Sequence, residues 1–207
     1  MTSSHLLRDD KNRLEPGYLL SLTLSLVLFG IALVAGLAYH LMVEGGLPGI
    51  FLEHLAQADR HAALENYERA AMAYRVAAAV APDDDRALVR LGLAARQLGD
   101  SRQTIDAFTR VLRVNPRHAG AHYFLGLTYF EQGDLERAAR HGAAAVRLAP
   151  DFADAHATLG AILLQQGKRA EAAHHFRQAL RLRPELEMAR RGLAELVEAP
   201  AVRADRR

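Results

Sequence analysis

Apolar residues follow two different patterns along the chain. From Tyr18 to Tyr39 no side chain is ionisable, and the polar residues in this stretch are only serine and threonine. Beyond residue 50, apolar residues instead recur about every three to four positions among charged ones, which is the spacing of amphipathic helices. The sequence therefore predicts one apolar helix followed by an array of helices that each bury one face.

The apolar stretch is long enough to cross a membrane. A helix over residues 18–39 is about 33 Å long, and the hydrocarbon core of a bilayer is about 30 Å thick. We therefore expect a transmembrane helix at residues 17–43 with residues 18–39 in contact with lipid, preceded by a segment at 1–16 and followed by a Gly/Pro-containing linker at 44–50. The alternative is a cleaved signal peptide, whose apolar core is shorter, at about 7–15 residues.

The charges on either side of this helix predict its orientation. Arg8, Lys11 and Arg13 precede it, whereas the first arginine or lysine after it is Arg60. The positive-inside rule then places the N-terminus in the cytoplasm and the rest of the chain on the far side of the membrane. Small residues four apart, such as Ala32 and Gly36, would also let the helix pack closely against another transmembrane helix.

The second pattern is an internal repeat with a period of about 34 residues. Proline recurs at this spacing, and small and large residues recur in the same register. The columns are Pro82, Pro116, Pro150 and Pro184; Ala58, Gly92, Gly126 and Gly160; Ala70, Thr104, Ala138 and Ala172; and Tyr74, Phe108, Gly142 and Phe176. Small side chains let two helices approach closely, and proline ends a helix because it lacks a backbone donor.

Turn and cap residues fit the same register. Gly99, Gly133 and Gly167 are placed to close the first helix of each pair in a left-handed conformation. Asp100 and Asp134 follow as N-caps of the second helix, and Asn66 takes this place in the first repeat. Lys168 breaks the cap pattern in the fourth repeat.

These columns resemble the tetratricopeptide repeat family, and the resemblance covers residues 51–186. It implies an all-α fold, an α-solenoid of four helical hairpins. The repeats would lie at residues 51–84, 85–118, 119–152 and 153–186. Residues 187–198 are expected to form a helix that caps the last hairpin, and residues 199–207 a disordered tail.

The resemblance also implies a binding surface. In this family the first helix of each hairpin lines the inner face of the solenoid, where partner segments bind. Carried onto this sequence, that face is an apolar trough with an arginine edge. Its residues are Arg86, Val89, Arg90, Leu93 and Arg96 in the second repeat, Tyr123, Leu127 and Phe130 in the third, and Ala157, Ala161 and Leu164 in the fourth.

Composition narrows the chemistry. The 26 basic and 24 acidic residues nearly balance, so there is no cationic footprint for nucleic acid. The chain has no cysteine, which excludes disulfides, thiolate metal sites and a cysteine nucleophile. His54, His122 and His156 share one repeat column, and we expect neighbouring copies to lie too far apart to bind one metal ion. The acidic run at 83–85 is read as a helix cap rather than a metal site.

No nucleophile motif or phosphate-binding loop is present, so we expect no catalytic residues, no cofactor and no enzymatic activity. The sequence favours a membrane-tethered scaffold that binds a protein partner. The resemblance implies that it supports assembly of a membrane or envelope complex, and we expect it in the bacterial inner membrane with the repeats in the periplasm. The alternative is a permanent accessory subunit that uses the transmembrane helix as an interface.

Overall fold

The computed structural model describes residues 47–204. The predicted transmembrane helix at residues 17–43 lies outside the described residues. Within residues 47–204, no helix is both long and apolar enough to cross a membrane. The chain divides into two units with a boundary between Ile50 and Phe51, and all four predicted repeats lie in the second unit.

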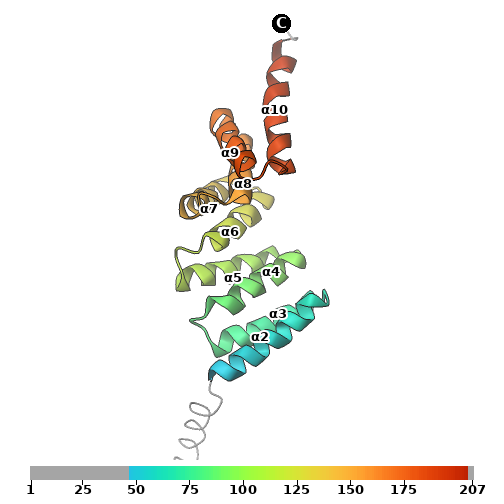
Figure 1. The fold of residues 1–207 in the computed structure, drawn as a ribbon, viewed down its shortest axis with the longest axis vertical. Coiled ribbons are helices and arrows are strands. Elements are labelled where there is room, and N and C mark those ends of the chain that lie inside the picture. Colours follow the sequence, from blue (N-terminus) through green and yellow to red (C-terminus); the bar gives the residue numbers. More distant parts are fainter. Residues whose placement is uncertain (1–46, 205–207) are drawn as a thin grey trace, which may run out of the picture. The chain divides into compact units, whose positions relative to one another are not determined.

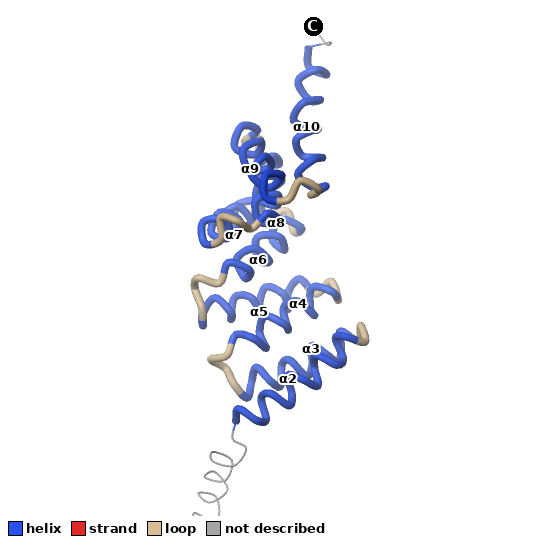
Figure 2. The backbone as a smooth tube through the Cα atoms, in the orientation of Figure 1, coloured by secondary structure: helices blue, strands red, loops and turns tan. Residues whose placement is uncertain are grey.

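Residues 47–204 are all-α, with no strand, as the sequence predicts (Figures 1 and 2). Antiparallel helices pair into hairpins, and each hairpin stacks on the next, with α3 against α4, α5 against α6 and α7 against α8. The last helix packs on α8 and α9. The helices are α2 (Leu47–Ala63), α3 (Tyr67–Val80), α4 (Asp85–Gln97), α5 (Ser101–Val114), α6 (Ala119–Glu131), α7 (Leu135–Leu148), α8 (Ala153–Gln165), α9 (Arg169–Leu182) and α10 (Glu187–Ala204).

Two helix ends differ from the sequence-based prediction. The first helix, α2, begins at Leu47, inside the segment 44–50 that was expected to be a linker. Pro48 lies in its first turn, where the missing N–H costs nothing because first-turn donors have no helical acceptor. The last helix, α10, continues to Ala204 instead of ending at residue 198. Pro200 lies within this extension and has no backbone N–H to donate, so the helix passes it with one hydrogen bond missing.

The hairpin turns use the predicted residues. Gly99, Gly133 and Gly167 have φ values of 71°, 77° and 78°, which lie in the left-handed region that glycine adopts without strain. In the first hairpin the same position is held by Glu65, at φ 56°. The side chains of Asn66, Asp100 and Asp134 cap the following helices, whereas Lys168 makes no such hydrogen bond.

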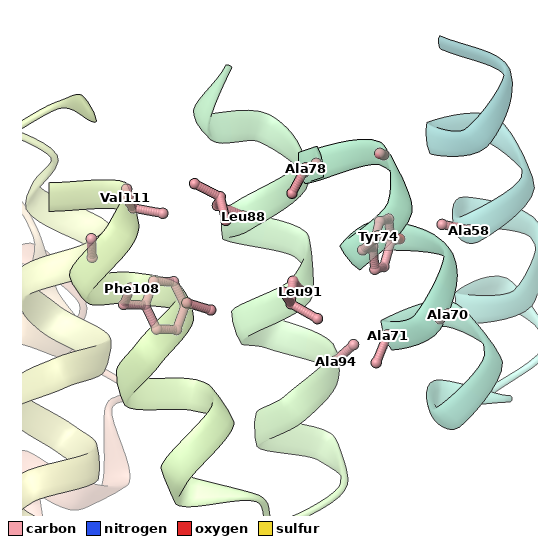
Figure 3. Packing of buried hydrophobic residues seen from close by; sticks show 14 of the residues in the cluster. Ala58, Ala70, Ala71, Tyr74, Ala78, Leu88, Leu91, Ala94, Phe108 and Val111 are labelled. Carbon is pink, nitrogen blue, oxygen red and sulfur yellow. The ribbon is translucent and has the colours of Figure 1, made fainter. Parts of the chain in front are cut away.

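The small-residue columns create the close contacts within each hairpin (Figure 3). A Cβ on Gly92 would lie 2.7 Å from the ring of Phe108, and one on Gly160 would lie 2.7 Å from Phe176. In the first hairpin Ala58 and Tyr74 take these positions and are both buried. The glycine and the aromatic ring therefore form one unit, since the ring occupies the space that a larger side chain would need.

The third hairpin replaces this aromatic residue by Gly142. The gap does not remain empty, because a Cβ at Gly142 would meet Leu159 at 3.2 Å and Ile162 at 3.5 Å. Both of these side chains come from α8 of the next hairpin and are buried. The missing ring is thus replaced by side chains of the next hairpin. Within the third hairpin the backbones approach closely, because a Cβ at Gly126 would lie 3.1 Å from the nitrogen of Gly142.

Candidate functional site

The predicted groove residues come from α4, α6 and α8, the first helices of hairpins two to four. Most keep part of their surface open, and Leu93 is 38% exposed. Ala157 is only 1% exposed, so its side chain is packed inside the repeat array. Leu93 on α4 is therefore the most exposed apolar member of the set, whereas Phe130, Ala161 and Leu164 are partly buried.

Three of the predicted residues, Phe130, Ala161 and Leu164, line one cleft of about 570 Å³. Its floor also includes the ring of Phe176, and α10 forms the opposite wall. Figure 1 shows α10 standing beside α8 and α9, which leaves this side of α8 facing it. The other lining residues are Gln165, Glu187, Met188, Arg191, Gly192 and Glu195. A floor of carbon atoms with charged groups on one wall suits an apolar side chain of a bound segment.

The arginine edge of the trough is bound to carboxylates. Arg96 on α4 donates two hydrogen bonds to Glu131 on α6, at 2.9 and 2.7 Å. This pair joins the inner-face helices of two successive hairpins. The hydrogen bonds from its guanidinium to Glu131 raise the pKa of Arg96. Arg96 is therefore committed to a neighbouring repeat and carries little free positive charge.

The other two arginines are also paired. Arg90 donates to Asp59 on α2, and the same carboxylate accepts a 2.7 Å hydrogen bond from the hydroxyl of Tyr74 on α3. Burial, together with the hydrogen bond to Asp59, raises the pKa of Tyr74 to about 12. Arg86 binds Asp84 through two of its nitrogen atoms.

These pairs change the expected chemistry of the groove. A trough with a free arginine edge would attract acidic segments, but each of its three arginines already has a carboxylate partner. These pairs are partly exposed to solvent, so each contributes little to stability and its arginine can exchange partners at small cost. The arginines therefore do not select between acidic and neutral segments, whereas the carbon-lined cleft favours an apolar side chain.

Tyr123 lies in a row of aromatic rings. Its centroid is 4.9 Å from Phe124, in an edge-to-face arrangement, and 4.8 Å from Phe152, which precedes α8. Phe124 in turn stacks on Phe108 at 5.0 Å. Burial raises the pKa of Tyr123, with the nearby charge of Asp154 adding to the effect. Tyr123 thus joins hairpin three to the residue that precedes α8, and its neighbour Phe124 joins hairpin three to hairpin two.

The sequence analysis missed two histidine pairs. His122 on α6 meets His141 on α7, and His156 on α8 meets His175 on α9, each with 3.0 Å between their Nδ1 atoms. The two pairs are equivalent positions of successive repeats. Comparing histidines within one repeat column could not find them, because each pair joins two columns across a hairpin. Among the described residues, no group of three or more potential ligands is placed to hold a metal ion.

The described helices form a stack of hairpins, with glycine at the turns inside the hairpins and proline after them. This architecture is that of the helical repeat proteins. Tetratricopeptide repeat models match residues 55–101, 89–153 and 153–186. Together these ranges cover most of the chain, and the chain belongs to the tetratricopeptide repeat family. No curated protein matches the chain in sequence.

Solved structures share the fold at low sequence identity. The crystal structure of MamA has a TM-score of 0.66 and 20% identity, covering 71% of this chain and 86% of that one. YrrB, described as having an unusual peptide-binding site, has a TM-score of 0.61 and 18% identity, with coverage of 68% and 73%. The first repeat domain of Spaghetti, bound to an HSP90 peptide, has a TM-score of 0.54 and 22% identity, with coverage of 56% and 93%.

Proposed function

We propose that this chain is a membrane-tethered, non-enzymatic scaffold that holds a segment of a partner protein and supports assembly of a membrane or envelope complex. The apolar helix at residues 17–43 would anchor it in the bacterial inner membrane, with the repeats in the periplasm. The observation that carries the proposal is the cleft between α8 and α10, whose floor is made by Phe130, Ala161 and Leu164.

Family and chemistry both support a binding role. Tetratricopeptide repeats are typically interaction modules without enzymatic activity, and two of the structural neighbours bind peptides. The apolar lining of the cleft favours a partner segment that inserts an apolar side chain. A tether would raise the local concentration of the repeats near membrane partners, so a modest affinity would be sufficient.

Site-specific cross-linking in native membranes tests the proposal. A photoreactive amino acid replaces Ala161 in the cleft of the full-length chain, and the same amino acid replaces Arg140 on the outer side of α7 as a control. We expect a covalent adduct with another protein from position 161 and none of the same mass from position 140. If both positions give the same adduct, or position 161 gives none, the cleft is not the binding site.

The orientation has its own test. A phosphatase that is active only in the periplasm is fused to the C-terminus of the full-length chain. We expect an active fusion that remains with the membrane fraction. An expressed but inactive fusion would place the repeats in the cytoplasm, and activity in the soluble fraction would show that residues 17–43 are not a stable anchor.

A further inference from the structure

One face of the first hairpin is apolar and exposed. On α3, Met72 is 64% exposed and Val76 is 46% exposed, and Ala79 lies one turn further along the same face. With residues of α2 they line a shallow hollow of about 610 Å³. We call Met72, Val76 and Ala79 the α3 face. Met72 and Val76 thus lie on one strip of α3 that the described part of the chain leaves open to solvent.

The other repeats show that this face is specific to the first hairpin. At the position of Met72 the later repeats carry Asp106, Arg140 and His174, and at the position of Ala79 they carry Arg113, Arg147 and Arg181. The repeat fold therefore does not require apolar residues there. Solenoid packing also does not bury them, since Met72 and Val76 are exposed while the neighbouring column residue Tyr74 is buried.

The rim of the hollow is basic. Arg69 and Arg75 on α3 line it, together with His54 and His61 on α2, and no carboxylate is among the lining residues. The sole acidic residue of α3 is Glu68, in the first turn. An apolar strip flanked by arginine is the pattern of helices that lie in the interface of a bilayer, where carbon atoms enter the acyl boundary and arginines meet anionic headgroups.

The position of this hairpin in the chain agrees with a lipid surface. The predicted transmembrane helix ends at residue 43 and α2 begins at Leu47. The residues between them can span only about 10–14 Å even when fully extended. If residues 17–43 cross the bilayer, the first hairpin is the repeat that must stay close to the headgroups, and it is also the repeat that carries the apolar face.

We propose that the α3 face of the first hairpin rests on the membrane surface, with Met72 and Val76 at the acyl boundary and Arg69 and Arg75 on anionic phospholipid headgroups. This inference rests on the proposed tether. Because the anchor confines the hairpin near the lipid, a contact too weak to bind vesicles alone would still be occupied most of the time. The contact would fix the direction in which the solenoid leaves the membrane.

The test uses the absence of tryptophan from the chain. A Met72→Trp variant of the full-length protein has a single tryptophan on the α3 face. It is reconstituted in vesicles of phosphatidylethanolamine and phosphatidylglycerol, with and without lipids brominated near the headgroup. We expect blue-shifted emission that loses intensity when brominated lipid is present. His174→Trp, at the same position of the fourth repeat, should show neither effect.

A second variant combines Met72→Trp with Val76→Asp and Ala79→Asp. It should fold with unchanged helicity but lose the blue shift and the quenching, because two carboxylates would have to enter the headgroup region.

Flotation of the vesicles separates the proposed membrane tether from the proposed docking of the α3 face. If the Met72→Trp protein floats and its tryptophan is not quenched, the tether stands and the docking of the α3 face is wrong. If the protein does not float, both are wrong.

One further outcome identifies another occupant. Blue-shifted emission without quenching by brominated lipid would mean that the α3 face is covered by protein, either a second copy or a partner, and would overturn the lipid proposal. Chemical cross-linking of the same sample would then distinguish a homodimer from a complex with another chain.

Discussion

The Nδ1 atoms of His122 and His141 lie 3.0 Å apart, and the geometry of their surroundings determines which of them carries the proton. The Nε2 atom of His122 is 3.3 Å from the carbonyl oxygen of Pro116, which can only accept. Neutral His122 therefore carries its proton on Nε2, and its Nδ1 accepts from the Nδ1–H of His141. The pair at His156 and His175 has the same arrangement, with Pro150 as the acceptor.

The histidine pairs predict a loss of stability in mild acid. Burial, and then the charge of the paired histidine, lowers the pKa of His141 to about 4, and that of His175 likewise. In the unfolded chain the pKa is about 6.5. The unfolded state therefore binds more protons below pH ~6.5, and stability should fall progressively between about pH 6.5 and 4. Urea unfolding followed by circular dichroism at several pH values in this range measures the effect.

The second repeat supplies the control for this prediction. At the positions of His122 and His141 it carries Leu88 and Ala107, both buried. Combining His122→Leu with His141→Ala should therefore preserve packing and make the dependence on pH shallower. Arg137, Arg140, Arg147 and His118 also act on this pair and remain in the variant. If the dependence on pH is as steep as in the wild type, other groups are responsible for it.

A methyl group at position 92 should loosen the second hairpin. In Gly92→Ala the new Cβ would lie 2.7 Å from the ring of Phe108, which is fully buried, so the ring or one of the two helices must shift. Overpacking of this kind costs about 1–3 kcal/mol, more than the helix propensity gained from alanine. Urea unfolding should show a lower midpoint. Gly49→Ala is the matched control, because nothing lies within 4 Å of a Cβ at this exposed position of α2, and it should not lower the midpoint.

The first hairpin should be stabilised by a glycine at its turn. Glu65 has φ 56°, where a side chain costs roughly 1–2 kcal/mol, and the equivalent positions of the other hairpins are glycine. Glu65→Gly removes this strain. The glycine also increases the conformational entropy of the unfolded chain, which offsets part of the stabilisation. We expect a net increase of about 0.5–1 kcal/mol in the free energy of unfolding. Gly99→Glu, the reverse change in the second hairpin, should be destabilising.

Much of the fold could be predicted from the sequence because its restraints are local and repeated. Each proline, glycine turn and aspartate cap acts within a few residues, and its recurrence in register, four times for proline and three times for the glycine turn, removes the ambiguity of any one copy. The ends α2 and α10 were less predictable because they have no neighbouring copy to fix their limits.

The groove was harder to predict than the fold. A repeat column shows that Arg96 faces inward, but it does not show that its guanidinium reaches Glu131 on the next hairpin. That contact depends on the reach of two long side chains across different columns. Similarly, α10 was expected only to cover the last hairpin, whereas in the structure it also forms one wall of the cleft.

The cleft depends on how closely α10 approaches α9, and Gly192 controls that distance. A Cβ at this position would overlap the ring of Phe176, so any larger residue must push α10 away. We expect Gly192→Leu to expose α10 to amide hydrogen exchange and to abolish the adduct from position 161, while hairpins one to three remain protected. Ala194→Leu adds bulk on the exposed side of the same helix and should leave both measurements unchanged. An adduct that persists in Gly192→Leu would mean that the partner binds α6 and α8 without needing the wall formed by α10.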